Sequence, residues 1–493
     1  MNTKGTFQAV VKALAYLTAV ALLVVSAFNL VYFFRDNTAA EDETSAVPSV
    51  PAVVSSSTDT QAWLGWQGGT IASSSPLYAQ ADPDGAVLCE LEQDSLAAVV
   101  ERQDGMLRVR TPLATGWIAE EHFRSASDAI ELPQSDFSED APAPMLTAAD
   151  RTRLDNIAED YGCVSVSAAT IRNGEVCDTY QYGWANKSKG LEMTADTKLC
   201  TASLSKVLVG MSAASMRDLG ILSLDEDISA YLGAPITNRA HPKTPITLRH
   251  LLTHTSSINE VTKYSSPRTM LMTGSSWSST RPGTPEAWRY SNIGIGSAGL
   301  TLEYASDMTL VNFTDSFYFD ALDVDASYYA PHITKPESIA TLYFNGGYVS
   351  ESTANQLDRF YVDKPGYNSK LYFGYLTISA QDYARLLCIL LGDGSYHGTA
   401  YMSPASAEEI KTPQYKLKNF DQCLVLRRRD NCYDGRTLHY HTGNSYGTLA
   451  LASFDDSTGD GVVVITTGAV PDRDEYDIYA VCGEMTDYLY SLM

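Results

Sequence analysis

The stretch TASLSKVLVG, from Thr201 to Gly210, places a serine three residues before a lysine at the head of an apolar run. On a helix, residues three apart share one face, so the Ser203 hydroxyl and the Lys206 amine can meet. A serine hydroxyl becomes a good nucleophile when a base takes its proton, and a lysine with a pKa depressed by burial can help. Serine also opens helices by capping free backbone N–H groups, so this pair alone leaves a structural alternative open.

Two further stretches supply the partners that a nucleophilic serine needs. Tyr290-Ser291-Asn292 follows a Pro-Gly turn and precedes a glycine-rich helix start. A tyrosine phenol beside a lysine can serve as general base, and the Asn292 amide can bind the lysine or a substrate amide. His441-Thr442-Gly443 begins a β-prone run, where the glycine lets a substrate lie against the strand edge. The N–H groups of Ser203 and Asn444 are then candidates for an oxyanion hole.

In this order, SLSK, YSN and HTG resemble the motifs of the serine β-lactamase and penicillin-binding-protein superfamily. They are most similar to its class C branch, which includes D-Ala-D-Ala carboxypeptidases and related esterases, over residues 147–493. The resemblance implies two-step acyl transfer without a cofactor, in which Tyr290, polarised by Lys206, takes the proton of Ser203. It assigns Asn292 and residues 441–443 to substrate positioning.

Several positions depart from the family pattern. Thr255-Ser256-Ser257 stands where T-S-G is usual, and Leu199 stands where a bulky aromatic is expected. Residues 331–372 look unlike the family and contain a rival Tyr343-Phe344-Asn345 without the Pro-Gly turn. His441 in place of lysine favours carboxypeptidases or esterases over dedicated β-lactamases. It leaves open which charge binds a substrate carboxylate, because histidine is only partly cationic near neutral pH.

Length and charge bound the kind of protein. The chain has 493 residues, enough for two or three domains, and its 35 Lys+Arg against 59 Asp+Glu give a net charge of −24. Nucleic-acid binding needs a cationic footprint, and no basic block stands out, so no nucleic-acid partner is expected. Of the eight cysteines, which fit an oxidising space, Cys423 and Cys432 are expected to form the local pair. No cysteine has zinc-site spacing, so no metal centre is expected.

The N-terminal region predicts a membrane anchor. Residues 13–34 form an uncharged, apolar run about as long as a membrane-crossing helix. Lysines precede the run and acids follow it, so the positive-inside rule puts residues 1–12 in the cytoplasm and the later domains outside. A single-pass protein of the cell membrane is therefore expected. A cleaved signal peptide is the alternative, but the run is long and ends in Tyr32, Phe33 and Phe34 rather than in small residues.

A small all-β module is expected between two linkers. Residues 63–124 hold short β-prone runs broken by turn signals such as Asp104-Gly105. The segments GGTIASSSPLY, MLRVR and GWIAEEHF resemble, in order, a bacterial SH3-like module, which implies contact with peptidoglycan; a barrel that binds nothing is the alternative. Residues 35–62 and 125–146 have the Ser-, Pro- and acid-rich composition of flexible linkers.

The remaining chain, residues 147–493, predicts an α/β domain. A helix opened by Thr147 is followed by two strands around Asn173-Gly174, helices dominate the middle, and strands return late. Strands at both ends predict one antiparallel sheet flanked by helices, with a helical subdomain beside it. His254 in LLTHTSS is expected to be a structural hydrogen-bonding residue rather than a catalytic one.

Together these features predict a multidomain, membrane-anchored, extracytoplasmic serine acyl hydrolase that acts on cell-envelope substrates through a Ser203 acyl-enzyme. Stem-peptide D-Ala-D-Ala is the first candidate substrate, and D-alanyl esters of wall polymers are the second. A β-lactamase, and a catalytically silent wall-binding receptor with the same fold, are the alternatives.

Overall fold

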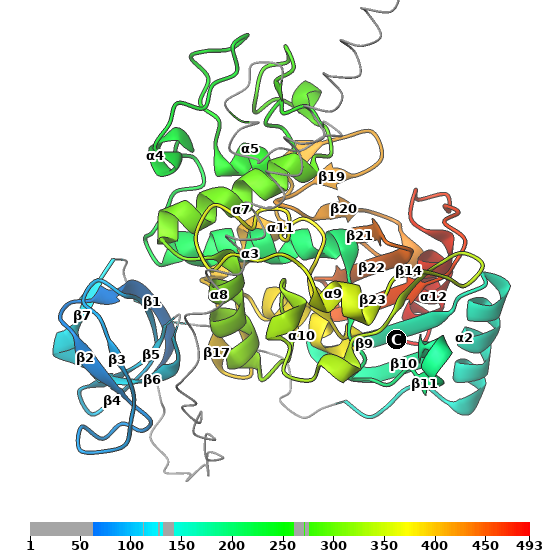
Figure 1. Ribbon diagram of the computed structural model, residues 1–493, viewed down its shortest axis with the longest axis horizontal. Helices are drawn as coiled ribbons and strands as arrows, with labels where there is room; N and C mark the ends of the chain where they lie inside the picture. The colour runs from blue at the N-terminus through cyan, green and yellow to red at the C-terminus, as the bar shows by residue number, and fades with distance from the viewer. Residues whose placement is uncertain (1–62, 112, 127–128, 132–141, 261–270, 272–275) are drawn as a thin grey trace, which may run out of the picture. The chain divides into compact units, whose positions relative to one another are not determined.

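The computed structural model describes residues 63–111, 113–126, 129–131, 142–260, 271 and 276–493 (Figure 1). The predicted anchor at 13–34 and the linker at 35–62 lie outside these residues. Among the residues that are described, no helix is long and apolar enough to cross a membrane.

The first described unit is a curved antiparallel sheet of eight strands (Figure 1). The strands are β1 (Trp63–Ile71), β2 (Ser75–Tyr78), β3 (Val87–Leu91), β4 (Leu96–Gln103), β5 (Met106–Arg110), β6 (Thr115–Ala119), β7 (Phe123–Ser125) and β8 (Ile130–Glu131). They enclose a core of their own that includes Ile71, Leu77, Val99 and Ile118. The described part of residues 63–131 is thus a β-sheet, which extends past the expected boundary at residue 124, because β8 pairs with β1.

The larger domain is built on a nine-stranded antiparallel sheet in the order β11-β10-β9-β23-β22-β21-β20-β19-β18. Its strands are β9 (Ser165–Arg172), β10 (Glu175–Asn186), β11 (Leu191–Glu192), β18 (Tyr415–Lys416), β19 (Asp421–Gln422), β20 (Arg427–Arg429), β21 (Leu438–Ser445), β22 (Thr448–Asp455) and β23 (Asp460–Thr467). The predicted turn at Asn173-Gly174 joins β9 to β10, with positive φ at both residues. Since β9 pairs with β23, the sheet does join the two ends of the domain, as expected.

Helices cover both faces of this sheet, which explains its continuous apolar runs. On β23, Val462 and Val464 pack with α2 (Ala148–Asp160) and α12 (Ala480–Tyr490), whereas Val463 and Ile465 belong to the core on the other face. Thr147 caps α2 in a capping box with Asp150, as predicted.

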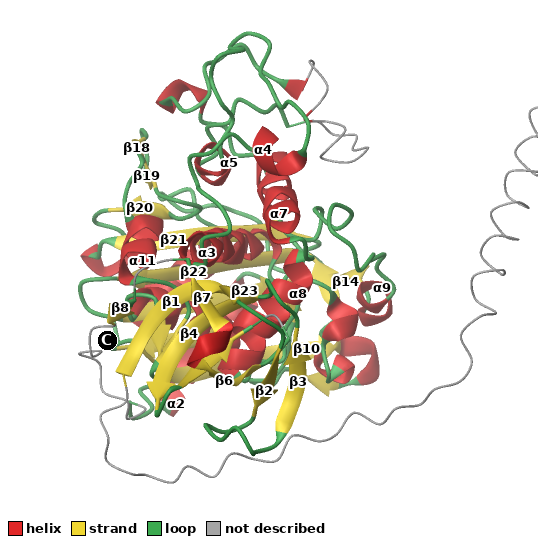
Figure 2. Cartoon of the chain, turned by 90° about the vertical axis from the view of Figure 1, so that its left-hand side faces the viewer, coloured by secondary structure: helices red, strands yellow, loops and turns green. Residues whose placement is uncertain are grey.

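On the opposite face α10 (Ala380–Leu391) packs against β9, β10 and β23, and the described residues hold further helices, which include the predicted helical part. These further helices are α3 (Ser205–Asp218), α4 (Ser229–Leu232), α5 (Leu248–Leu252), α7 (Asn292–Ser306), α8 (Leu310–Thr314), α9 (Thr353–Leu357) and α11 (Pro404–Lys411). Figure 2 shows α4, α5 and α7 gathered at one end of the domain. Short strand pairs lie outside the main sheet, namely β12 (Leu199–Cys200) with β15 (Thr377–Ile378), β13 (Leu342–Phe344) with β14 (Tyr348–Glu351), and β16 (Ser395–Tyr396) with β17 (Thr399–Ala400).

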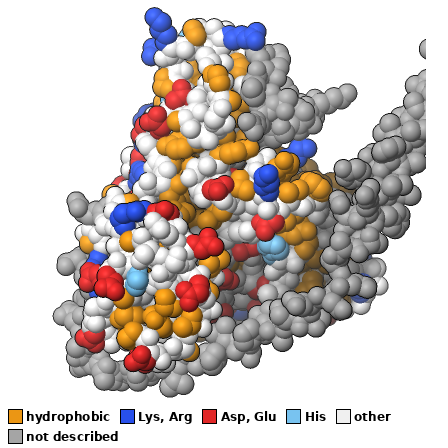
Figure 3. All heavy atoms as spheres, turned by 60° about the vertical axis from the view of Figure 1, so that its left-hand side comes forward, with side chains coloured by type: hydrophobic (Ala, Val, Ile, Leu, Met, Phe, Trp, Pro, Cys, Tyr) orange, Lys and Arg blue, Asp and Glu red, His pale blue; other side chains and the backbone are white. Residues whose placement is uncertain are grey.

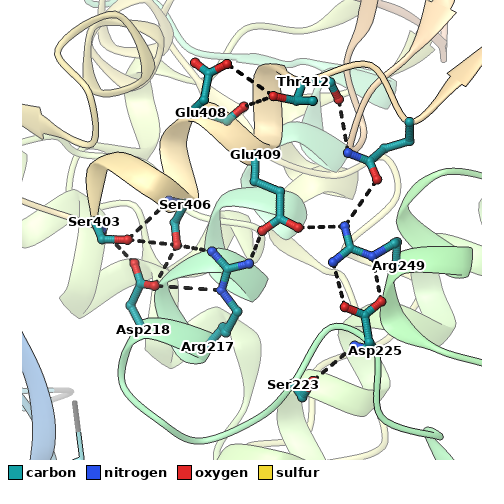
Figure 4. Close-up of polar contacts among 11 residues, drawn as sticks. Arg217, Asp218, Ser223, Asp225, Arg249, Ser403, Ser406, Glu408, Glu409 and Thr412 are labelled. Atoms are coloured by element: carbon teal, nitrogen blue, oxygen red, sulfur yellow. Dashed lines mark hydrogen bonds and ion pairs between the residues drawn. The ribbon is translucent and has the colours of Figure 1, made fainter. Parts of the chain in front are cut away.

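A polar network links α3, α5 and α11 (Figure 4). Arg249 of α5 donates to both carboxylate oxygens of Asp225, at 2.6 and 2.7 Å, and lies 2.7 Å from Glu409 of α11. Glu409 also pairs with Arg217 of α3, and the neighbouring Asp218 accepts hydrogen bonds from the first turn of α11. The network fixes the helix that follows the nucleophile against the helical part of the domain.

The cysteines correct one prediction. Cys423 and Cys432 are free thiols rather than a pair. Strand β20 lies between them, so that Cys423 packs in the core on the α3 side and Cys432 packs in the core beneath α12. Their separation of nine residues along the chain therefore crosses the sheet layer.

Basic side chains are scattered over the surface. On the face drawn in Figure 3, Lys and Arg side chains stand singly among acidic and apolar ones and form no continuous basic patch. This distribution agrees with the net charge of −24.

Candidate active site

Ser203 lies on a sharp turn between β12 and α3. It belongs to a 3₁₀ turn, Ala202–Leu204, in which Ala202 has a positive φ of 51°. Such a conformation costs a non-glycine residue energy and must be held by its surroundings. The preceding residue, Thr201, stabilises the turn, because its N–H and hydroxyl both donate to the carbonyl of Leu376, at 2.8 and 3.0 Å. No side-chain cap opens this turn or α3, so capping is not the role of Ser203.

Lys206 lies directly beneath the nucleophile. Its Nζ is 2.8 Å from Ser203 Oγ and 2.5 Å from the carbonyl oxygen of Phe373, and the side chain is fully buried. Burial lowers the pKa of Lys206 well below its usual value; Glu260 acts in the opposite direction, and Arg427 lowers the pKa further. The amine is therefore available in its neutral form, as a base needs to be.

Tyr290 completes the centre, and its pKa is shifted in the direction opposite to that of Lys206. Its ring centroid is 5.1 Å from Lys206 Nζ, and its phenol hydrogen-bonds to Ser203. Burial raises the pKa of Tyr290 to about 12, although the hydrogen bond with Ser203 lowers it. The sequence predicted Tyr290, polarised by Lys206, as the base. These pKa directions favour Lys206 as the base and a neutral Tyr290 phenol that relays protons.

The residues around Tyr290 are fixed by the head of α7. Ser291 caps this helix, since its hydroxyl accepts the N–H of Gly294 at 2.9 Å. Its own N–H donates to His254 Nδ1 at 3.2 Å, and the His254 ring is 4.6 Å from that of Tyr290. His254 thus has the structural hydrogen-bonding role that was expected, and Asn292 begins the helix beside the nucleophile.

Strand β21 brings the third motif against the nucleophile turn. A Cβ on Gly443 would lie 2.6 Å from the carbonyl oxygen of Thr201, so only glycine permits this approach. His441 is buried, with Nδ1 2.8 Å from the carbonyl oxygen of Thr442. Burial is the largest cause that holds the pKa of His441 well below its usual value, and the neighbouring Lys206 and Arg427 side chains act in the same direction. The histidine is therefore neutral and supplies no cation for a carboxylate.

A cavity of about 350 Å³ opens above these residues. It is lined by Ser203, Tyr290, Asn292, Phe373, Gly374, Tyr375, Arg427, Thr442, Asn444, Ser445, Tyr446, Arg473, Asp477 and Tyr479. Of the predicted site residues, Ser203, Tyr290, Asn292, Thr442 and Asn444 line it. Lys206, His441 and Gly443 do not line it but support the residues that do. The rival Tyr343 is buried elsewhere, where its hydroxyl accepts the N–H of Lys187.

The structure adds residues that the sequence did not single out. Arg427 enters the cavity from β20, where it pairs with Tyr440 of β21 and lies 5.8 Å from the Tyr290 ring. Arg473 enters from the segment before α12 and donates to Tyr479 at 3.0 Å. Tyr375 and Tyr446 meet across the cavity through their hydroxyls, 2.5 Å apart. Among the described residues, no cluster of three or more His, Cys, Asp or Glu could hold a metal ion.

Comparisons with known proteins agree with this geometry. The Beta-lactamase family model matches residues 151–481. A putative penicillin-binding protein PbpX of Bacillus subtilis is 29% identical over 111 residues, which cover 22% of this chain and 26% of that protein. Esterase EstB of Burkholderia gladioli is 30% identical over 131 residues, which cover 26% of this chain and 33% of the esterase. The chain thus spans about a third or less of these two relatives.

A solved structure shows the same fold. The β-lactamase/D-alanine carboxypeptidase from Pseudomonas syringae aligns with a TM-score of 0.55 at 19% identity, over 70% of this chain and 96% of that one. This identity is low enough that the likeness concerns the fold alone.

Three features define a serine hydrolase of the β-lactamase and penicillin-binding-protein type. Buried Lys206 is hydrogen-bonded to Ser203, Tyr290 lies beside Lys206, and Gly443 packs against the nucleophile turn. The chain belongs to the Beta-lactamase family.

Proposed function

We propose that this protein is a membrane-anchored, extracytoplasmic D-Ala-D-Ala carboxypeptidase that trims stem peptides of the cell wall. The observation that carries the proposal is Arg427, which lines the cavity, whereas the other arginine there, Arg473, is paired with Asp477 and the buried His441 is neutral. A peptide that ends in D-Ala presents a carboxylate, and guanidinium groups bind carboxylates with fitting geometry. A D-alanyl ester of a wall polymer presents no such group.

The residues present support a balanced two-step reaction. Lys206 accepts the hydroxyl proton of Ser203 as Oγ bonds to the carbonyl carbon of the penultimate residue. The C–N bond to the terminal D-Ala then breaks, and the departing nitrogen takes a proton through Tyr290. Water attacks the acyl-enzyme in the second step and releases the shortened peptide, which restores the Ser203 hydroxyl. The N–H groups of Ser203 and Asn444 are the proposed oxyanion donors.

The location and the accessory module are part of the proposal. The apolar run at 13–34 supports a single membrane anchor, and an anchor favours a substrate that is fixed in the envelope. The β-sheet domain at 63–131 supports a wall-contacting role through the resemblance of its sequence to SH3-like modules. Esterase activity is the second candidate, because EstB is among the relatives.

The test is release of D-Ala from a diacetyl-L-Lys-D-Ala-D-Ala peptide by the full-length protein in detergent. We expect release by the wild type and a KM about tenfold or more higher for Arg427→Gln, since a charge-assisted hydrogen bond contributes about 1.5–3 kcal/mol. Arg428→Gln is the matched control, because Arg428 pairs instead with Asp421 and Asp430. Absence of D-Ala release would contradict the carboxypeptidase proposal and favour the esterase. Equal cleavage of a peptide with a C-terminal carboxamide would contradict recognition of the substrate carboxylate by Arg427.

A further inference from the structure

Glu260 contacts the segment that carries Tyr290 and Asn292. Its Oε2 accepts hydrogen bonds from the Ser291 hydroxyl at 2.9 Å and from the N–H of Ile293 at 3.3 Å. The neighbouring Ser291 N–H donates to His254. The Tyr290–Asn292 segment is therefore held from two sides, by a carboxylate and by a neutral imidazole.

The position suits a carboxylate for a second reason. Helix α7 runs for 15 residues, and its first turn presents free N–H groups and the positive end of the helix dipole. Ser291 cannot satisfy these alone, because its hydroxyl already caps Gly294. Glu260 accepts hydrogen bonds from the N–H of Ile293 and from the hydroxyl of Ser291 at the same time.

Glu260 also opposes Arg427 in the electrostatics of the centre. Burial is the largest influence on the pKa of both Lys206 and Tyr290; beyond it, Glu260 raises both pKa values and Arg427 lowers both. The other titratable groups that face Lys206 and Tyr290 are His254 and His441, which burial keeps neutral, and Tyr479.

We propose that Glu260 is a positioning residue of this active site. Its carboxylate holds Ser291 and the first turn of α7, and through them it fixes the Tyr290 phenol and the Asn292 amide beside Ser203 and Lys206. The inference rests on acylation of Ser203 and does not depend on which acyl donor the enzyme uses.

The test measures the second-order rate of Ser203 acylation by p-nitrophenyl acetate as a function of pH, for the full-length protein. Glu260→Gln keeps the shape and an accepting oxygen but removes the charge. Loss of the Glu260 charge destabilises protonated Lys206 and stabilises the Tyr290 phenolate. The pKa values of both groups therefore fall. We therefore expect both limbs of the pH profile to move to lower pH in Glu260→Gln.

Two further variants separate positioning from general damage. Glu260→Ala removes the hydrogen bonds as well, and we expect its acylation rate to fall about tenfold to a hundredfold, the effect of a small misplacement of catalytic groups. Glu260→Asp should recover part of the rate. Glu226→Gln removes one exposed acid that does not line the cavity and should match the wild type.

Specific outcomes would overturn the proposal. The first is a wild-type acylation rate and pH profile in Glu260→Gln together with a wild-type rate in Glu260→Ala. The second is a lower rate in Glu260→Gln with both limbs of its pH profile unshifted and with a lower melting temperature. Because the ester carries no D-Ala, a shifted profile with no D-Ala release from the peptide would leave Glu260 confirmed and the carboxypeptidase proposal rejected.

Discussion

Lys206 and Tyr290 lie in one site, and burial shifts their pKa values in opposite directions, down for Lys206 and up for Tyr290. Desolvation disfavours the charged form of each group, which means a neutral amine for Lys206 and a neutral phenol for Tyr290. A neutral amine 2.8 Å from Ser203 Oγ is ready to accept a proton, whereas a neutral phenol is ready to donate one.

The first prediction follows from this division. Lys206→Met fills the same buried space without a charge and should lower the acylation rate of Ser203 by about 10²–10⁴-fold, the usual contribution of a general base. Tyr290→Phe should lower it less. Stopped-flow acylation by p-nitrophenyl acetate measures both rates, with the melting temperature as the fold control. A larger loss in Tyr290→Phe than in Lys206→Met would show that the phenol is the base.

A second prediction concerns Ser257, which stands where the family has glycine. It has a positive φ of 65°, a conformation that strains a residue with a side chain, but its hydroxyl donates to the carbonyl of Thr280 at 2.7 Å. Ser257→Ala keeps the strain and loses the bond, so its free energy of unfolding should fall by about 1 kcal/mol. Ser257→Gly also loses the bond but relieves about 1 kcal/mol of strain and should be near neutral. Chemical denaturation tests the pair, and equal stabilities of the two variants would refute the argument.

At the scale of elements, the approach of β21 to the nucleophile turn decides whether the site forms. Residue Gly443 lies opposite Ala450 of β22 and against Thr201, so the sheet and the turn are in direct contact. The third prediction is that Gly443→Ala lowers kcat/KM by up to about 10²-fold, because a shift of about 1 Å displaces catalytic groups. We also expect a loss of about 1–3 kcal/mol in the free energy of unfolding from overpacking. Steady-state kinetics and urea denaturation measure the two effects, and wild-type values in both would contradict this view of the contact.

Strand register also explains what the sequence could not predict. The SLSK, YSN and HTG motifs indicated the site because their residue types and order are informative by themselves. Arg427 was not predicted, because it stands in a run of three arginines that look equivalent in the sequence. Only the pairing of β20 with β21 decides that Arg427 enters the cavity while Arg428 pairs with acids elsewhere.

At the scale of the whole molecule, the layered fold was predictable from the chain. The β-prone runs at both ends of the domain, with helices between them, required a sheet that joins distant segments, and β9 does pair with β23. The cysteines were not predictable, because their packing depends on which face of that sheet each one reaches.

The fourth prediction concerns the polar network that links three helices. Burial raises the pKa of Glu409, but hydrogen bonds from Arg217 and Arg249 outweigh this effect and leave it below its usual value. A lowered pKa means that the ionised group stabilises the fold above about pH 4.5 and that this stabilisation is lost as the pH falls further. Glu409→Gln should therefore lower the free energy of unfolding by about 1–3 kcal/mol at pH 7 and by much less at pH 3. Urea denaturation at the two pH values gives the answer, and a difference that does not depend on pH would contradict the charged network.

The most direct measurement is the intact mass of the full-length protein after exposure to a fluorophosphonate and, separately, to a penicillin, with Ser203→Ala as control. We predict one covalent adduct per chain in the wild type and none in Ser203→Ala, and the lifetime of the penicillin adduct will separate carboxypeptidase-like from β-lactamase-like turnover. A folded wild type that neither reagent labels, or a label that persists in Ser203→Ala, would contradict the assignment of Ser203 as the nucleophile and leave a binding protein with this fold as the better description.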